Sequence, residues 1–71
     1  MTHFRRVAII GVGLIGGSLA LALKKKRITR EVVGYFRRSN VAKKALQKRI
    51  VHRATTSMKV AVQDADLVVL A

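Results

Sequence analysis

Three glycines at the spacing Gly-x-Gly-x-x-Gly are the residues best suited to chemistry in this chain: Gly11, Gly13 and Gly16. An aliphatic run at residues 7–10 precedes them, and a helix-forming run at 17–23 follows. In such a unit the first glycine permits a tight turn, the second lets the backbone approach a pyrophosphate, and the third lets helix and strand pack closely. The amides near Leu14 and Ile15 would face the phosphates at the positive end of the helix dipole. The pattern predicts a dinucleotide-phosphate cradle, and the alternative is a tight strand-helix turn of another α/β protein.

The end of the second predicted strand decides which nucleotide such a cradle would select. About twenty residues beyond Gly16, an NAD enzyme of this fold places Asp or Glu, which accepts hydrogen bonds from the adenosine ribose hydroxyls. This chain has Phe36 there, followed by Arg37, Arg38 and Ser39. Without a carboxylate there is no repulsion against a 2′-phosphate, and an arginine can donate charge-assisted hydrogen bonds to that phosphate or stack on adenine. We therefore expect NADP rather than NAD. The alternative is that Phe36 is an apolar strand residue that blocks the ribose pocket, with both arginines solvated.

The elements that must position these residues alternate between strands and helices along the chain. Aliphatic or β-branched runs predict buried parallel strands at 6–10 and 31–36 and a last buried strand at 67–70, after Asp66. A first helix is expected over 14–26. Its buried positions recur at helical spacing: Ile15, Leu19, Ala22 and Leu23.

Polar start signals mark two further helices. Ser39 or Asn40 is expected to cap the second helix. Its apolar positions are Val41, Ala42, Ala45, Leu46 and Ile50. The hydroxyl residues at 55–57 offer another N-cap before a short helix at 58–63. The order βαβα(β)αβ predicts an α/β fold, the Rossmann-like half, with a mainly parallel sheet, right-handed crossovers and helices on its faces. The cofactor would lie across the carboxyl ends of the strands.

Length and composition limit the classes of function. A chain of 71 residues forms one small domain and buries only about 60% of its unfolded surface, so its core is marginal. The absence of cysteine excludes a disulfide framework and a thiolate metal site, and we expect no metal. The apolar stretches are too short for a membrane span, and the N-terminus lacks the pattern of a signal peptide. We therefore expect a cytoplasmic protein.

Positive charge is the second prominent feature of the chain. Fifteen Lys and Arg residues against three acidic residues give a formal net charge of +12. They include short basic runs at 5–6, 24–27, 37–38, 43–44 and 48–49. The favoured interpretation is that most of these runs are solvated helix surfaces and helix C-terminal ends, where cations complement the dipole. The alternative function is a basic mini-domain that binds nucleic acid or other polyanions non-specifically through phosphates. Sequence-specific recognition is not expected, because only Phe4, Tyr35 and Phe36 are aromatic.

Longer stretches of the chain resemble one family. The stretch VAIIGVGLIGGSLALA at 7–22, with VVGY at 32–35 and DADLVVLA at 64–71, is similar to the N-terminal end of prephenate dehydrogenase and the related arogenate dehydrogenases. The Gly-Leu-Ile-Gly-Gly-Ser stretch at 13–18 is more specific to that group than the glycine spacing alone. The resemblance implies an NAD(P)-dependent oxidative decarboxylation in tyrosine biosynthesis. In that reaction a nicotinamide takes hydride from the cyclohexadienol carbon as carbon dioxide leaves.

The resemblance also implies what this segment lacks. In that family the catalytic histidine, the substrate-binding arginines and a helical dimerisation domain lie further along the chain. Residues 1–71 would thus be a truncated dinucleotide-binding domain, without the catalytic helical domain and without turnover alone. Neither His3 nor His52 occupies a catalytic position. Half of such a sheet would leave the strand at 67–70 unpaired, so we expect a homo-oligomer formed through this exposed strand edge.

Several positions depart from the family pattern. Arg27 and Arg49 stand where such proteins usually have a glycine just after each helix. If the backbone there is left-handed, each arginine costs on the order of 1 kcal/mol. His52 and Arg53 fall where acidic residues are common in the family.

Overall fold

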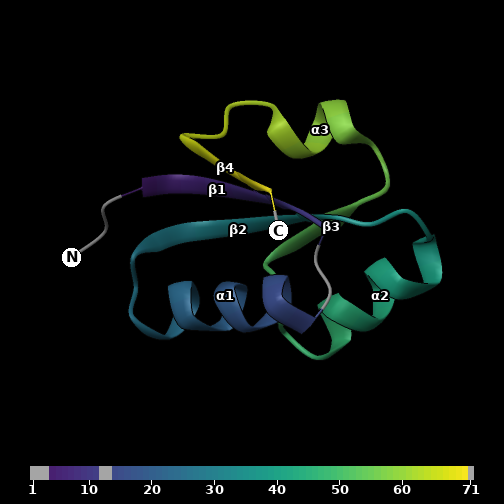
Figure 1. Ribbon diagram of the computed structural model, residues 1–71, viewed down its shortest axis with the longest axis horizontal. Coiled ribbons are helices and arrows are strands. Elements are labelled where there is room, and N and C mark those ends of the chain that lie inside the picture. The colour runs from purple at the N-terminus through teal and green to yellow at the C-terminus, as the bar shows by residue number, and fades with distance from the viewer. Residues whose placement is uncertain (1–3, 12–13, 71) are drawn as a thin grey trace.

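A single parallel sheet with helices on both faces forms the protein (Figure 1). The computed structural model describes residues 4–11 and 14–70. The elements in chain order are β1 (Phe4–Ile10), α1 (Leu14–Lys25), β2 (Thr29–Tyr35), α2 (Ser39–Gln47), β3 (Arg53–Thr55), α3 (Met58–Val62) and β4 (Leu67–Leu70). The strand order is β3-β2-β1-β4, and all three pairings are parallel. Helices α1 and α2 cover one face and α3 lies on the other (Figure 1). The predicted α/β Rossmann-like half is confirmed.

The core lies between the two central strands and the layer formed by α1 and α2. Val7 and Ile9 of β1 are fully buried, as is Val32 of β2, which is the register partner of Val7. These three aliphatic side chains pack with Leu23 and Phe36 in one cluster. The burial of an almost continuous apolar run is typical of a parallel strand that is paired on both sides.

The buried face of α1 differs by part of a turn from the sequence prediction. Leu23 is buried and Leu19 packs against the core as predicted, but Ala22 is exposed and Ala20 is fully buried instead. Residues 20 and 23 are three apart and share a face, whereas consecutive residues point about 100° apart. Ala22 therefore turns toward solvent. The helix ends at Lys25 rather than at residue 26, and the side chain of Ile15 lies outside the described residues.

The predicted cap of α2 is wrong, whereas the cap of α3 is confirmed. Ser39 and Asn40 are the first helical residues of α2, and the N-cap is Arg38, which has an extended backbone and makes no side-chain cap hydrogen bond. A serine that is already helical does not occupy the cap position, so its hydroxyl cannot take that role. In α3 the Ser57 hydroxyl accepts a hydrogen bond from Val60 N at 3.3 Å. This helix ends at Val62, one residue earlier than expected.

Only part of the apolar pattern predicted for α2 reaches the core. Ala42 and Ala45 are buried and Ile50 packs against the core, but Val41 and Leu46 are exposed. The short helix therefore touches the sheet mainly through its two alanines.

Both longer helices end in the same left-handed turn. Arg27 has φ 54° and Arg49 has φ 57°, so both arginines have the left-handed backbone that was the condition for strain at these positions. After α1, the amides at 27 and 28 donate to the carbonyls at 24 and 23, and after α2 the amides at 49 and 50 donate to those at 46 and 45. This pairing is the Schellman motif, whose left-handed position is usually glycine. Each helix thus ends with an arginine in glycine's place.

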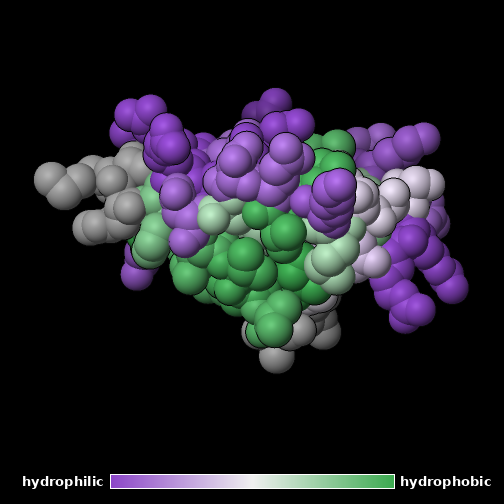
Figure 2. Space-filling view, turned by 90° about the horizontal axis from the view of Figure 1, so that it is seen from above, coloured by the Kyte–Doolittle hydropathy of each residue, from purple (hydrophilic) through white to green (hydrophobic). Residues whose placement is uncertain are grey.

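The last strand is exposed rather than buried, and that prediction is wrong. β4 is an edge strand that pairs only with β1. Leu67, Val68 and Leu70 are exposed, Leu70 at 80% of its surface. Figure 2, which views the molecule from above, shows apolar side chains over the centre of this face and hydrophilic ones around its edges. An edge strand without a charged residue offers its free backbone groups to a further strand.

Candidate nucleotide-binding cleft

A cleft of about 870 Å³ opens where β1 and β2 end. It is lined by Ile10, Gly11, Tyr35, Phe36, Arg37, Arg38 and Val41. Ile10 and Tyr35 are register partners, so the two strands end level and the segments that follow them meet. Ligands of open parallel sheets bind outside these carboxyl ends. The structure thus brings Gly11 of the glycine turn together with the segment after β2 in one cleft.

The turn after β1 has the backbone that its first glycine was expected to supply. Gly11 has φ 81°, a conformation that side chains with a Cβ rarely adopt. Helix α1 begins at Leu14, so the backbones of Leu14, Ile15 and Gly16 form its first turn. The first amides of a helix have no partner within the helix and attract anions. Gly13 lies outside the described residues.

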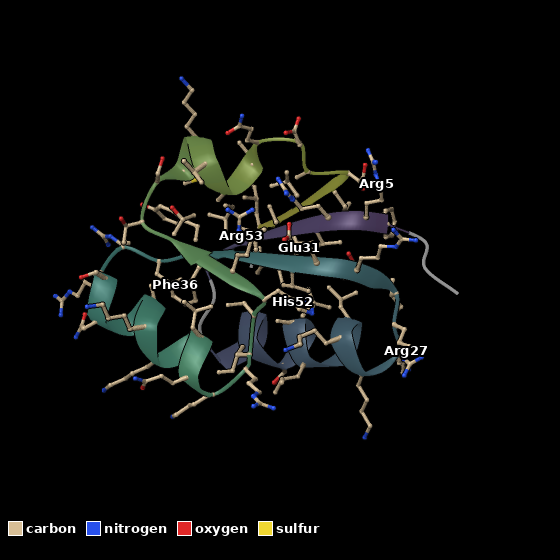
Figure 3. All side chains as sticks on the ribbon, turned by 180° about the vertical axis from the view of Figure 1, so that it is seen from behind. Arg5, Arg27, Glu31, Phe36, His52 and Arg53 are labelled. Atoms are coloured by element: carbon tan, nitrogen blue, oxygen red, sulfur yellow. The ribbon has the colours of Figure 1, made fainter. Side chains whose placement is uncertain are left out.

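Phe36 is a core residue at the base of this cleft. Its side chain is 5% exposed and belongs to the core cluster, on the α2 side of the sheet (Figure 3). Its backbone N donates to Thr55 O at 2.9 Å, which holds the end of β2 against β3. A Cβ at Gly34 would lie 2.8 Å from Cε2 of this ring, so the ring packs directly on the glycine backbone. Most of the ring therefore faces the core and leaves little surface to the cleft.

Two unpaired cations stand at the rim of the cleft. Arg37 and Arg38 are exposed, and neither guanidinium has a hydrogen bond or ion pair within the described part of the chain. None of the residues that line the cleft is acidic. Ser39 is exposed at the start of α2 and is not among the lining residues. The rim is therefore equipped to meet an anion from two arginines.

Sequence reasoning missed three lining residues and one polar network. Ile10, Tyr35 and Val41 line the cleft and directly adjoin residues or segments that were predicted, so a search of sequence neighbours would have found them. Their inclusion adds an apolar wall on which a flat ring could lie.

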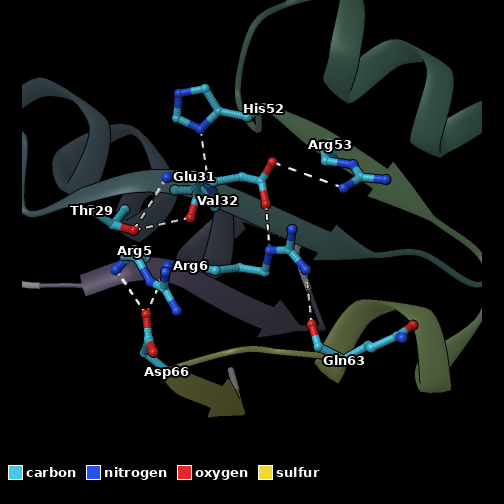
Figure 4. A network of polar contacts seen from close by, with 9 residues as sticks. All are labelled: Arg5, Arg6, Thr29, Glu31, Val32, His52, Arg53, Gln63 and Asp66. Carbon is cyan, nitrogen blue, oxygen red and sulfur yellow. Dashed lines mark hydrogen bonds and ion pairs between the residues drawn. The ribbon is translucent and has the colours of Figure 1, made fainter.

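The polar network lies on the α3 face of the sheet (Figure 4). Arg6 donates to Glu31, its register partner on β2, and to Gln63 O at 2.9 Å. Arg53 is 4.0 Å from the other Glu31 oxygen. These residues are far apart in sequence, so only the strand register reveals them. The network stabilises the sheet opposite the helix layer.

The side chains of Asp66 and His52, next to this network, accept hydrogen bonds from backbone amides of β1 and β2. Asp66 Oδ2 accepts from the backbone N of Arg5 at 2.8 Å and of Arg6 at 3.0 Å, and these bonds hold the pKa of Asp66 below its usual value. His52 Nδ1 accepts from Val32 N at 2.8 Å. Partial burial, together with the charge of Lys24, lowers the pKa of His52, although Glu31 acts in the opposite direction. Both groups serve the fold and lie away from the cleft.

The described residues form neither a cluster of metal ligands nor a membrane-spanning helix. Within residues 4–11 and 14–70, no group of three or more His, Cys, Asp or Glu side chains could hold a metal ion. No helix in the same part of the chain is long and apolar enough to cross a membrane.

Comparisons with known proteins agree with the fold and the cleft. Residues 6–71 match the family described as NADP oxidoreductase coenzyme F420-dependent. The chain is 36% identical over 69 residues to prephenate dehydrogenase of Lactococcus lactis subsp. cremoris (strain MG1363). This match covers 94% of this chain and 18% of that protein. The crystal structure of prephenate dehydrogenase from A. aeolicus in complex with hydroxyphenyl propionate and NAD+ superposes with a TM-score of 0.81 at 34% identity. That match covers 93% of this chain and 23% of the other.

The chain thus spans less than a quarter of the length of either relative. The match extends from the first buried strand to the end of the chain, and it includes every element that forms the cleft. The chain therefore belongs to the family described as NADP oxidoreductase coenzyme F420-dependent, and it resembles the N-terminal dinucleotide-binding segment of prephenate dehydrogenase.

Proposed function

We propose that the chain is the NADP(H)-binding segment of an oxidoreductase like prephenate or arogenate dehydrogenase. The observation that carries this proposal is the cleft at the carboxyl ends of β1 and β2, which is lined by a left-handed Gly11 and by two arginines that have no partner among the described residues. Neither feature alone is specific. Together they match two groups of one ligand, the central pyrophosphate and the 2′-phosphate of the adenosine ribose.

The glycine turn would hold the pyrophosphate. Gly11 and Gly13 keep the backbone free of side chains next to it, and the amides of Leu14, Ile15 and Gly16 open α1. The positive end of the helix dipole adds to their attraction for the phosphates.

The segment after β2 would select the adenosine end of the ligand. Arg37 and Arg38, with Ser39 at the start of α2, offer donors to a 2′-phosphate. Phe36 stands where a carboxylate would favour NAD, and its buried ring supports the base of the cleft. Glu31 is engaged by Arg6 and Arg53 on the opposite face, so it does not supply the missing carboxylate.

The reaction proposed for the whole enzyme is the oxidative decarboxylation of prephenate or arogenate in tyrosine biosynthesis. When bound, the nicotinamide accepts the hydride from the substrate ring. The residues of this chain bind and orient the dinucleotide at its phosphates. None of its described residues has a place in the proton or hydride transfer, so we expect cofactor binding without turnover from this segment alone.

Calorimetric titration of NADP, NAD and adenosine 2′,5′-bisphosphate tests the proposed preference. We expect NADP and the bisphosphate to bind with similar affinity and NAD to bind more weakly. Replacing Arg37 and Arg38 by Gln should weaken NADP about tenfold or more, because a hydrogen bond to a charged group contributes about 1.5–3 kcal/mol. NAD should change less than about threefold. Arg53→Gln with Lys59→Gln, on the other face, removes the same number of cations and is the matched control. Equal binding of NAD and NADP to the unaltered chain would contradict the NADP preference while leaving the phosphate cradle in place.

A further inference from the structure

The acidic residues of the chain all lie away from the layer formed by α1 and α2. The sequence has three of them, Glu31, Asp64 and Asp66. Glu31 pairs with Arg6 and Arg53 on the α3 face, and the two aspartates lie between α3 and β4. Helices α1 and α2, which cover the other face, therefore carry no negative side chain (Figure 1).

Basic residues gather at the same layer, along α2 and at the C-terminal ends of both helices. We call this set the basic layer: Lys24, Lys25, Lys26, Arg27, Lys43, Lys44, Lys48 and Arg49. All are exposed except Lys24, which is half-buried. Lys24 Nζ donates to the backbone oxygen of Arg49, which joins the end of α1 to the turn after α2. The two basic helix ends thus form one surface.

Two members of the basic layer occupy positions where glycine would be easier to accommodate. Arg27 and Arg49 have φ near +55° in the Schellman turns, a conformation that glycine adopts without steric cost. Neither guanidinium has a hydrogen bond or ion pair within the described residues, so no contact in the fold offsets that cost. Lys24 and Lys25, in the last turn of α1, already supply cations to the negative end of its dipole. Each arginine is thus left free to meet an external anion.

We propose that the basic layer binds the phosphate backbone of a nucleic-acid duplex without sequence specificity. An extended array of cations, of which only Lys24 is hydrogen-bonded among the described residues and which contains no acid, matches a repeated anion better than a single phosphate. Neither helix carries an aromatic residue, so there is no platform for unstacked bases and a duplex is favoured over a single strand. Helix α1 runs away from the cleft and ends beside the start of β2 (Figure 1), and no member of the basic layer lines the cleft. The proposed duplex binding is therefore separate from the proposed dinucleotide site.

The Schellman turns allow a test in which loss of charge does not cost stability. Arg27→Gly with Arg49→Gly removes two cations and relieves both strained backbones. Its control, Arg53→Gln with Lys59→Gln, removes two cations on the α3 side, so both variants lower the net charge from +12 by two, to +10. Binding of a DNA duplex and an RNA duplex of arbitrary sequence is measured by fluorescence anisotropy from 50 to 300 mM salt. Thermal unfolding is recorded for each variant.

The two variants are expected to differ in duplex binding while both remain folded. The glycine variant should unfold at the same temperature as the unaltered chain or higher. Its log-log salt slope should fall by about 1.8, since each phosphate contact on a duplex contributes about 0.9, and its affinity at 100 mM salt should drop tens of fold. The control should lose less than about threefold. DNA and RNA duplexes should respond alike.

Four results would overturn the proposal. The first is no binding of either duplex at low salt, and the second is an equal loss in both variants, which would show an effect of net charge alone. A third is equally tight binding of polyglutamate, because the layer would then recognise acidic polymers rather than a duplex backbone. The fourth is displacement of the duplex by NADP, which would place the contact in the cleft.

Discussion

One methyl group added at Gly34 should destabilise this domain measurably. In Gly34→Ala the new Cβ would lie 2.8 Å from Cε2 of Phe36, and 3.1 Å from both Cζ of that ring and Cγ1 of Val51. Real Cβ atoms essentially never approach a neighbour within 3.0 Å, so something must shift. Both neighbours are core residues, Phe36 at 5% and Val51 at 2% exposure, and neither has a flexible end to move aside. Overpacking of this kind costs about 1–3 kcal/mol.

That cost is large for so small a domain. A chain of 71 residues is held by roughly 4–10 kcal/mol in total, so Gly34→Ala would remove a substantial part. Urea denaturation followed by circular dichroism measures the change. Phe36→Leu removes the two ring atoms that meet the new Cβ, and by itself costs about 1.5 kcal/mol.

A double-mutant cycle separates this contact from other effects. With Phe36→Leu in place, Gly34→Ala should cost at least about 1 kcal/mol less than it does alone, because the contacting atoms are gone. Additivity of the two changes within about 0.5 kcal/mol, or a neutral Gly34→Ala, would refute the placement of the ring on the glycine backbone.

Three further outcomes are expected. Partial burial and the charge of Lys24 lower the pKa of His52, so its contribution to stability is present above pH 6.5 and is lost as the pH falls through its lowered pKa. His52→Ala should remove that dependence in urea titrations between pH 5 and 7. Hydrogen bonds from the backbone amides of Arg6 and Arg5 lower the pKa of Asp66, so its contribution to stability is present above pH 3.8 and is lost in more acidic solution. Acid unfolding of Asp66→Asn should lack this component. The uncharged β4 edge should pair with a second copy, and Val68→Lys should return the protein to a monomer in sedimentation velocity. A compact monomer of the unaltered chain at high micromolar concentration would contradict the last outcome.

The features that the sequence predicted well are those set by neighbouring residues. The aliphatic runs placed every main strand within two residues, and the hydroxyl of Ser57 placed the start of α3. The family pattern singled out Arg27 and Arg49 as residues that stand in place of glycine, and both have a left-handed backbone. Gly11 likewise has the positive φ that its place in the motif requires.

The errors concern features that depend on the rest of the fold. Ala20 rather than Ala22 is buried because the sheet fixes the rotation of α1, which the helical spacing alone leaves open. Leu70 is exposed because β4 is an edge strand, and strand order cannot be read from an aliphatic run.

The same reason explains what the sequence showed of the cleft. The sequence placed Phe36 at the end of the second strand, but it could not show toward which face of the sheet the ring points. The direction of its ring depends on the space above Gly34 and beside Val51. Phe36→Asp would introduce the carboxylate that NAD enzymes of this fold carry at this position. It would place that carboxylate in the core, so we expect it to unfold the domain. Arg37 and Arg38 are the better positions for that test, since both are exposed.

The central claim is that the glycine turn is a dinucleotide site, and titration of Gly13→Val tests it most directly. Chemical shifts are followed while NADP, ATP and inorganic polyphosphate are added to the unaltered chain and to this variant, with circular dichroism to confirm that both are folded. We predict that NADP binds the unaltered chain more tightly than ATP or polyphosphate, and that Gly13→Val abolishes NADP binding by blocking the approach of the pyrophosphate. Equal binding of all three ligands, unchanged by Gly13→Val, would show that charge alone attracts them and that the turn is not a cofactor site.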